Sequence, residues 1–274
     1  MPGQPIVAFC KSYGPDLERC AQLVKSFRRH NRDLNALYLS VPAEERKLFR
    51  ERLGTEGIEY LSDEEILGGS IAQSWGSQQL VKLHFGLLDI AENYFWIDSD
   101  FVIIRDFGEA EFFAFPGIPY TVAWELRRNL FQRRLLGGSA MEEDAEHAQM
   151  VASVRAALEV IRDRFNRQGP LLCYGAPAIW SSKVVRALAE TAQGNGFDFQ
   201  KMLEIAPFEL NWYGEFLMAS RIIPVIPRDN MALHFTRDYE YENFLKAGWT
   251  MADLAGEGFL AVNFASKWMQ AVEI

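Results

Sequence analysis

The sequence predicts an α/β fold in which helices cover a parallel, doubly wound sheet. Three short apolar runs, Ile6–Cys10, Asn35–Val41 and Gly57–Leu61, have the length and composition of buried strands. Two segments of helical length separate them, one beginning at Asp16 and one over Pro42–Leu53. Strands that alternate with helices at this spacing normally pair in parallel.

The first loop and the first helix follow from turn and capping residues. Lys11-Ser12-Tyr13-Gly14-Pro15 ends the first strand, and Asp16 is an expected N-cap. The apolar positions after it recur at helical spacing: Leu17, Cys20, Leu23, Val24 and Phe27. Ligands of doubly wound sheets bind beyond the carboxyl ends of the strands, which is where this loop would lie.

A helix over Gln73–Ile90 precedes the most informative segment, the apolar run Tyr94–Ile104, which only Asp98-Ser99-Asp100 interrupts. In one continuous strand, Asp98 and Asp100 would point to the same face. Two such carboxylates suit Mg²⁺ or Mn²⁺ and a metal-bound diphosphate. In the alternative interpretation, the strand ends at Ile97 and Ser99-Asp100 begins a polar turn.

The second half of the chain begins with a strand at Tyr120–Trp124 and a helical insertion at about 125–168. The insertion holds a basic cluster, Gly137-Gly138-Ser139, an acidic run and a long helix to about Arg167. The clustered charges are Arg127, Arg128, Arg133, Arg134, Glu142, Glu143, Asp144 and Glu146. They are typical of a solvated helical face; the functional alternative is a mobile cover over the ligand site, with the glycines as its hinge.

The remaining segments complete a single predicted domain over residues 1–274. They are a strand, turn and strand over Pro170–Trp180, a helix over Lys183–Gln193, the aromatic- and carboxylate-rich Pro207–Phe216, a strand over Arg221–Ile226 closed by Pro227, and the apolar run Ala232–Phe235.

Composition limits the classes of function and partner. The chain has 274 residues, is 49% hydrophobic and 24% charged, and carries a formal net charge of -9, which argues against a nucleic-acid-binding surface. Three cysteines without metal-ligand spacing fit reduced thiols in the cytosol. No secretory signal and no run of about 20 apolar residues is present, so we expect a soluble, cytoplasmic protein without a membrane span.

Several segments together resemble the metal-dependent, Asp-x-Asp-containing glycosyltransferases of the GT-A fold. Lys82-Leu83-His84-Phe85-Gly86-Leu87-Leu88 runs into the Asp98-Ser99-Asp100 segment, and Leu233-His234-Phe235-Thr236 is similar to the later histidine motif of that family. Lys246 and Trp249 match its following lysine and aromatic residue. The resemblance is to the glycogenin- and galactosyltransferase-like group and its bacterial relatives of uncharacterised specificity. It implies one Rossmann-like domain with a doubly wound mixed sheet.

The resemblance also implies a site. Asp98, Asp100 and His234 would hold Mn²⁺ or Mg²⁺. Asp100 is a candidate catalytic residue, because the ion that it holds would neutralise the leaving diphosphate. Lys82 and Lys246 are candidate phosphate partners. In the alternative interpretation, the two lysines are solvated charges on helix surfaces. For His234 the alternative is a buried imidazole whose hydrogen bonds are satisfied within the protein. The donor would be a nucleotide-sugar, a UDP-sugar being favoured, and the acceptor an unidentified glycan or small molecule.

Three further residues are candidates for substrate contacts. Lys11 and Tyr13 follow the first strand, where this fold receives the nucleoside, and Tyr13 could stack on the base or simply pack. Glu209 lies among aromatic residues and is the candidate general base if the reaction inverts, or an orienting group if it retains. We expect its pKa to be raised and its side chain to face the aspartates. A carboxylate at a helix start after Pro207 is the alternative.

Two other functions compete with glycosyl transfer. A metal-dependent nucleotidyltransferase shares the architecture and the paired aspartates, but it usually has a glycine-rich first loop, and Lys11–Pro15 holds one glycine. A non-catalytic nucleotide- or glycan-binding protein of the same fold is the third possibility. Asp98, Asp100 and His234 argue against it, because each costs stability if left unpaired near a core.

Overall fold

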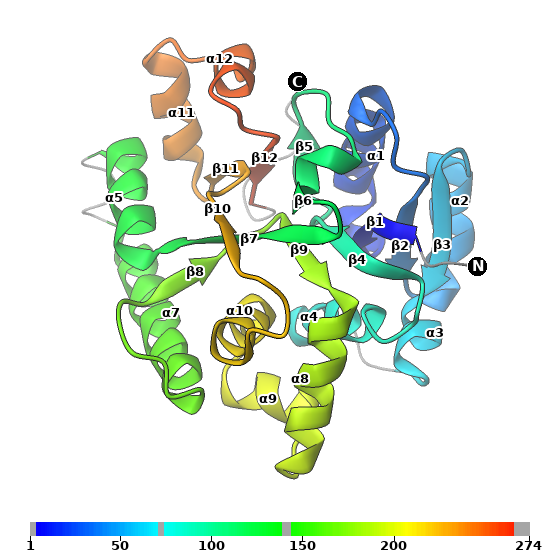
Figure 1. Ribbon diagram of the computed structural model, residues 1–274. Coiled ribbons are helices and arrows are strands. Elements are labelled where there is room, and N and C mark those ends of the chain that lie inside the picture. The colour runs from blue at the N-terminus through cyan, green and yellow to red at the C-terminus, as the bar shows by residue number, and fades with distance from the viewer. Residues whose placement is uncertain (1–3, 71–73, 139–143, 266–274) are drawn as a thin grey trace.

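The computed structural model describes residues 4–70, 74–138 and 144–265, and its centre is a five-stranded mixed sheet (Figure 1). In sheet order the strands are β3 (Ile58–Ser62), β2 (Leu37–Val41), β1 (Gln4–Lys11), β4 (Ala91–Trp96) and β9 (Ala178–Ser181). The first four are parallel, and β9 is antiparallel to β4. The predicted doubly wound α/β class is therefore confirmed, with the antiparallel strand at one edge.

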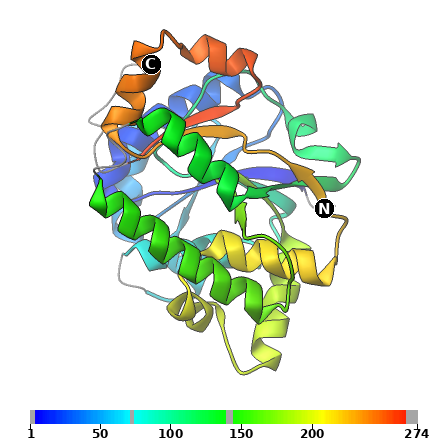
Figure 2. The ribbon, with the colours of Figure 1, turned by 90° about the vertical axis from the view of Figure 1, so that its left-hand side faces the viewer.

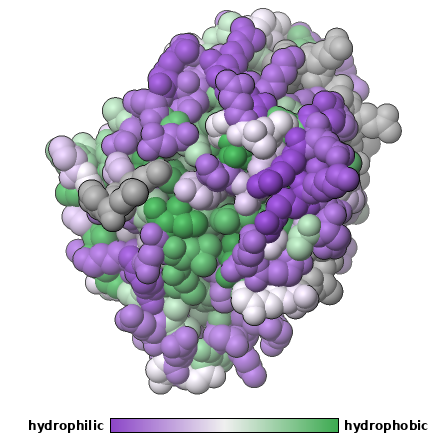
Figure 3. All heavy atoms as spheres, turned by 90° about the vertical axis from the view of Figure 1, so that its right-hand side faces the viewer, coloured by the Kyte–Doolittle hydropathy of each residue, from purple (hydrophilic) through white to green (hydrophobic). Residues whose placement is uncertain are grey.

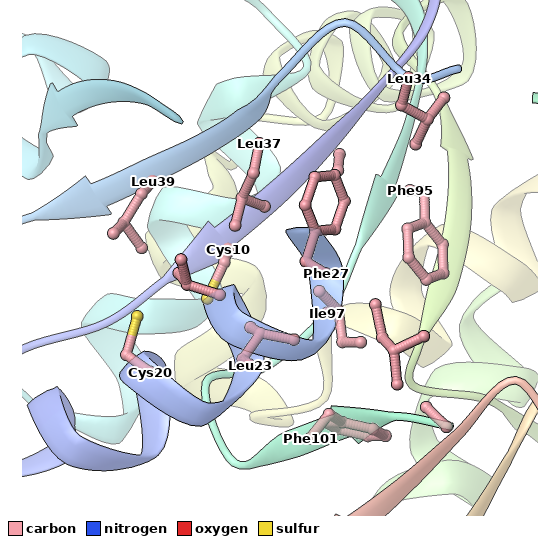
Figure 4. Close-up of a cluster of buried hydrophobic side chains, with 14 of the residues drawn as sticks. Cys10, Cys20, Leu23, Phe27, Leu34, Leu37, Leu39, Phe95, Ile97 and Phe101 are labelled. Carbon is pink, nitrogen blue, oxygen red and sulfur yellow. The ribbon is translucent and has the colours of Figure 1, made fainter. Parts of the chain in front are cut away.

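Both faces of this sheet are covered, and β1 shows how. Ile6, Ala8 and Cys10 belong to a core shared with helix α1 (Leu17–His30), whereas Val7 and Phe9 belong to a second core on the other face. Successive strand residues point to opposite faces, so an unbroken apolar run is what a doubly covered strand requires. Figure 4 shows the α1 side of this core.

The helices of the second core and the short elements near the sheet have the following bounds. They are α2 (Arg46–Leu53), α3 (Asp63–Leu67), α4 (Trp75–Phe85), α8 (Ser182–Gly194), α9 (Phe199–Ile205) and α10 (Glu209–Ser220), with 3-10 turns η1 (Gly14–Asp16), η2 (Ala43–Glu45) and η3 (Glu109–Phe112). Of these, α3, α4, α8, α9 and α10 supply buried residues to the second core. On the side of the molecule where α2 and β3 lie, apolar residues gather between hydrophilic ones (Figure 3).

Two smaller sheets hold the other strands of the described residues. One has the order β10 (Ile226–Arg228), β7 (Ile118–Glu125), β6 (Phe113–Phe115), with β8 (Leu172–Tyr174) also paired to β7. The other has the order β11 (Ala232–Phe235), β12 (Ala261–Phe264), β5 (Phe101–Ile103). This third sheet positions the site, because β5 follows the two aspartates and β11 carries His234.

The predicted insertion at 125–168 is largely helical. It holds α5 (Leu126–Gly137) and α7 (Ala145–Arg164), which face the viewer in Figure 2. Helix α11 (Asp238–Lys246) lies beside α5, with α12 (Met251–Gly256) beyond it, and the Asn243 side-chain amide donates to the Leu136 carbonyl at 2.8 Å (Figure 1). Of the expected hinge, Gly137 ends α5 and Gly138 follows it with a φ of 56°. Of the acidic run, Asp144 accepts from Arg237 Nε at 2.9 Å. Ser139, Glu142 and Glu143 fall outside the described residues.

Two predicted elements of the fold differ from the structure. The helix expected over Gln73–Ile90 covers Trp75–Phe85, with Gln73 outside the described residues. At Gly86 a Cβ would come within 2.9 Å of the Tyr94 hydroxyl, and Asp89 turns the chain with a φ of 46°. The helix ends there because the chain must turn to enter β4 at Ala91.

The strand expected over Arg221–Ile226 is wrong. Arg221 has a φ of 50° and caps the C-terminus of α10, so the chain leaves a helix there. The strand is Ile226–Arg228 and contains Pro227. It lies at the edge of its sheet, where a residue without a backbone N–H costs no ladder hydrogen bond.

Candidate functional site at the end of strand β4

The acidic segment is a turn between two sheets. β4 ends at Trp96 and β5 begins at Phe101, so the single strand predicted over Tyr94–Ile104 is wrong and the turn interpretation is right. Ile97 is fully buried and Phe101 is 1% exposed; Figure 4 places both in the core. Because these two anchors are fixed, Asp98 and Asp100 are held beyond the carboxyl end of β4, next to the end of β1, where doubly wound sheets bind ligands.

Lys82 links the first aspartate to a carboxylate from another helix. Its Nζ lies 2.7 Å from Asp98 Oδ1 and 3.2 Å from Glu209 Oε1. The same ammonium lies 4.0 Å from the centroid of the Trp96 ring. Burial opposes the charge on Lys82, but the two carboxylates outweigh it and raise the pKa of Lys82 above its ordinary value. Lys82, Asp98 and Glu209 thus form one charged cluster, which we call the Lys82 cluster.

Glu209 is the first residue of α10 and is 6% exposed. Its backbone N–H donates to Gln79 Oε1 at 3.1 Å, which satisfies a helix-terminal donor. Burial raises the pKa of the Glu209 carboxyl, Lys82 opposes the rise, and Asp98 adds to it. Glu209 therefore lies at a helix start, which agrees with the alternative interpretation of this residue. It is also linked to Asp98, because both carboxylates contact the Lys82 ammonium. Its catalytic role stays a prediction.

Asp100 is held by a residue that lies far away in the sequence. Asn263, on β12, donates from Nδ2 to Asp100 Oδ1 at 2.7 Å. Burial, followed by the negative charges of Asp98 and Asp16, raises the pKa of Asp100 to about 7. The two aspartates of the turn therefore act on each other electrostatically, as the motif requires, although no strand pairs them.

His234 lies on β11, which pairs with β12 in parallel. The ring faces Phe101, with centroids 5.4 Å apart, and its hydrogen-bonding neighbours are the Ala176 backbone and the Asn263 side chain. Burial and then Arg133 lower the pKa of His234 to about 4, so the imidazole is neutral at physiological pH. Asp98 also acts on this ring, and Asn263 connects it to Asp100.

The metal set was expected to bring three ligands together. Across 4–70, 74–138 and 144–265, no group of three or more histidine, cysteine, aspartate and glutamate side chains is placed to hold a metal ion. Asp98, Asp100 and His234 do lie in one neighbourhood, because each acts on another of the three. Metal binding by these three residues stays a prediction.

The other predicted ligand residues have different surroundings. Lys11 Nζ forms a fully buried ion pair with Asp63 Oδ2 at 2.9 Å. Tyr13 is partly exposed, and its ring centroid is 6.0 Å from that ammonium. Lys246 is exposed on α11 and pairs with Glu242 at 3.2 Å, as a solvated helix charge does. The structure places neither lysine in the Lys82 cluster.

Two residues at the site belong to no motif that sequence analysis identified. Asp16 was expected to cap α1, but its side chain does not; it accepts from Arg19 Nη1 at 2.5 Å and also interacts with Ser99. Asn263 is an isolated polar residue in the apolar run Ala261–Phe264. A polar side chain in a buried strand was the available signal for Asn263. Asp16 gave none, because an aspartate at a helix start is ordinary.

A cavity of about 810 Å³ lies elsewhere, between α5, β10, β11, α11 and α12. Leu233 lines it, whereas the neighbouring His234 belongs to the opposite face of the strand. Its lining contains none of the residues of the Lys82 cluster and neither Asp100 nor Asn263. The cavity is therefore separate from the candidate site.

The described part of the chain contains no helix that is both long enough and apolar enough to cross a membrane.

A family model described as "Family of unknown function (DUF6492)" matches residues 5–223, and the chain therefore belongs to this family. No curated protein matches the chain at a significant level. Among solved structures, the apo structure of the bifunctional glycosyltransferase WbbM is similar, with a TM-score of 0.46 and 10% sequence identity. The match covers 94% of this chain and 45% of that one, so this chain spans less than half the length of WbbM. A similarity of this size leaves the activity to be inferred from the site.

Proposed function

We propose that this member of DUF6492 is a glycosyltransferase that moves a sugar from a nucleotide-diphosphate sugar to a glycan or small-molecule acceptor. A UDP-sugar is the favoured donor. The observation that carries the proposal is the Lys82 cluster, in which one buried ammonium joins Asp98, at the end of β4, to Glu209 at the start of α10. The resemblance to GT-A enzymes around the aspartates and His234 supports the same conclusion.

The side chains at the turn are of the kinds that bind Mn²⁺ or Mg²⁺. Asp98 and Asp100 offer carboxylate oxygens, and the Asp98 side chain is 31% exposed and thus reachable from solvent. His234 is neutral, the form in which imidazole ligates a metal. In the proposal Asp98 and Asp100 hold the ion and His234 is the third ligand. When bound, the ion supplies the positive charge that stabilises the leaving diphosphate.

The protein's own residues have separate tasks in this proposal. Lys82 holds the carboxylates of Asp98 and Glu209 at a fixed separation, so donor and acceptor groups are positioned together. Glu209 is buried and its pKa is raised, which suits a carboxylate that accepts a proton from an acceptor hydroxyl. If the reaction retains configuration, Glu209 orients the acceptor instead. Asn263 fixes the orientation of Asp100.

The proposal is tested by the ligands that stabilise the purified protein. We expect Mn²⁺ with UDP to raise the melting temperature by several degrees, because a ligand that binds only the folded state stabilises it. The measurement is a thermal-shift panel of UDP, GDP and CTP, each with and without Mn²⁺. Preference for CTP, with release of pyrophosphate on turnover, contradicts the proposal in favour of a nucleotidyltransferase. No response to any nucleotide contradicts catalysis of either kind.

Glu209→Gln is expected to lower turnover far more than donor affinity, because metal and phosphate contacts hold the donor and not Glu209. The loss should be about 100-fold or more, the scale of general acid–base catalysis. The measurement is kcat and the donor KM, with donor hydrolysis as the assay where the acceptor is unidentified. Glu204→Gln, at an exposed glutamate on α9, is the matched control. Unchanged turnover in Glu209→Gln would remove the proposed role of this carboxylate.

A further inference from the structure

Helix α5 has a second inward-facing side, whose residues do not line the large cavity. Arg128, Gln132, Leu135 and Leu136 line the cavity, and helical geometry places Arg133 on another side of α5, with Leu126 and Gly137. Leu126 is 6% exposed and Gly137 is buried, so this second side faces the protein. Arg133 therefore differs from the neighbouring Arg134, which is exposed.

The guanidinium of Arg133 is held at the end of the strand that carries His234. Arg133 Nη1 donates to Thr236 Oγ1 at 2.8 Å. Thr236 is itself fixed by Glu240, whose Oε2 accepts from the Thr236 N–H at 2.6 Å and from its hydroxyl at 3.0 Å. Glu240 is fully buried, so this support is rigid. An arginine from the 125–168 insertion is thereby fixed two residues beyond His234.

Strand pairing places the end of β11 next to the acidic turn. His234 and Phe235 on β11 pair with Asn263 and Phe264 on β12. Asn263 Nδ2 donates to Asp100 Oδ1 at 2.7 Å, and the Phe264 N–H donates to the Asp100 carbonyl at 3.1 Å. Arg133, held at Thr236 just beyond this strand end, therefore lies on the side of the sheet where Asp100 is held. A positive group at this end of β11 is where an anion bound beside Asp98 and Asp100 would find a partner.

The lysines predicted to bind phosphate are engaged in other ways. Lys246 is exposed and paired with Glu242, Lys11 is buried against Asp63, and Lys82 bridges Asp98 and Glu209. A guanidinium also suits the task better than an ammonium, because its planar donors match two phosphate oxygens at once.

We infer that Arg133 binds the diphosphate of the nucleotide-sugar donor, so that α5 of the insertion forms one wall of the donor site. This inference rests on the proposed function and names a residue that binds the donor substrate of the proposed enzyme. The chemical class of ligand is a nucleoside diphosphate, recognised through its phosphate oxygens. The basic segment of the insertion then has two roles, with Arg133 turned inward and Arg134 left in solvent.

The test compares UDP with uridine, both with Mn²⁺, on wild type, Arg133→Met, Arg133→Lys and the control Arg134→Met. We expect Arg133→Met to weaken UDP binding by about 10- to 100-fold, the value of a hydrogen-bonded charge pair. Uridine binding, measured by competition, should change by less than about twofold, because uridine has no phosphate. Arg133→Lys should give an intermediate loss of UDP affinity at an unchanged melting temperature, and Arg134→Met no loss.

Three results would overturn the inference. UDP binding by Arg133→Met or Arg133→Lys at wild-type strength removes Arg133 from the donor site. Equal losses of affinity for UDP and uridine would show that Arg133 acts in folding, and a lower melting temperature would reveal this independently. Arg133→Lys keeps the positive charge at this position, so it tests ligand binding even if Arg133→Met lowers the stability of the fold. If wild type itself binds no nucleoside diphosphate, the proposed function fails as well, and the two failures are thereby distinguished.

Discussion

Asp100→Asn should abolish metal-dependent donor turnover and leave the fold intact. We expect a loss of about 100- to 1000-fold, the scale seen when one group that stabilises developing charge is removed. The asparagine can still accept the hydrogen bond that Asn263 Nδ2 makes to Asp100 Oδ1 at 2.7 Å. Its neutral amide removes the repulsion with Asp98, so the melting temperature should not fall. Asp100→Ala should lose activity to the same degree.

The pH dependence of stability provides a second measurement on the same variant. The pKa of Asp100 is about 7 in the folded protein, against about 3.9 for an unfolded aspartate. Between these values the folded state binds more protons than the unfolded state, so stability falls as the pH rises from about 4 to about 7. Asp100→Asn lacks this contribution, and its melting temperature should exceed that of wild type by more at pH 7 than at pH 4.

Asp163→Asn is the control for both measurements, since that carboxylate is 65% exposed on α7. A fully active Asp100→Asn enzyme would contradict the metal mechanism. Equal pH profiles for wild type and Asp100→Asn would show instead that Asp100 ionises normally in the fold.

Lys82→Met should produce the largest loss of stability. The Lys82 side chain is 7% exposed and its ammonium pairs with Asp98 and Glu209; the Glu209 side chain is also 7% exposed. Removing one partner of a buried pair usually costs about 3 to 5 kcal/mol, because the remaining charge is left uncompensated. The melting temperature should fall by roughly 10 °C. The loss should shrink as the pH is lowered, since protonated carboxylates need no counter-charge.

A double variant separates the charge from the packing of Lys82. Lys82→Met combined with Glu209→Gln should recover part of the lost stability, because no ionised carboxylate is then left at position 209. The measurement is a double-mutant cycle of unfolding free energies. Lys47→Met is the control, since Lys47 on α2 is 87% exposed. A Lys82→Met protein as stable as wild type would show that the charges of the Lys82 cluster do not depend on each other.

Local patterns in the sequence were enough to predict the central architecture. An apolar run such as Ile6–Cys10 fits only a strand with both faces covered, and its alternation with helices predicts parallel pairing. The same patterns failed at Tyr94–Ile104. Apolar residues flank Asp98 and Asp100 on both sides, and this continuity does not reveal that the chain leaves one sheet and enters another. Periodicity reports burial, and both Ile97 and Phe101 are buried.

Sequence patterns alone identified the α/β class, the aspartate pair, and Lys82, Glu209 and His234 as candidate residues. Which of these residues meet became visible in the three-dimensional packing. Lys82 and Glu209 are 127 positions apart, and Asn263 and Asp100 are 163 apart. Such contacts depend on how helices and sheets pack, and no local pattern encodes them. For the same reason Arg133 looked like one of four solvated arginines until its hydrogen bond to Thr236, just beyond β11, showed its direction.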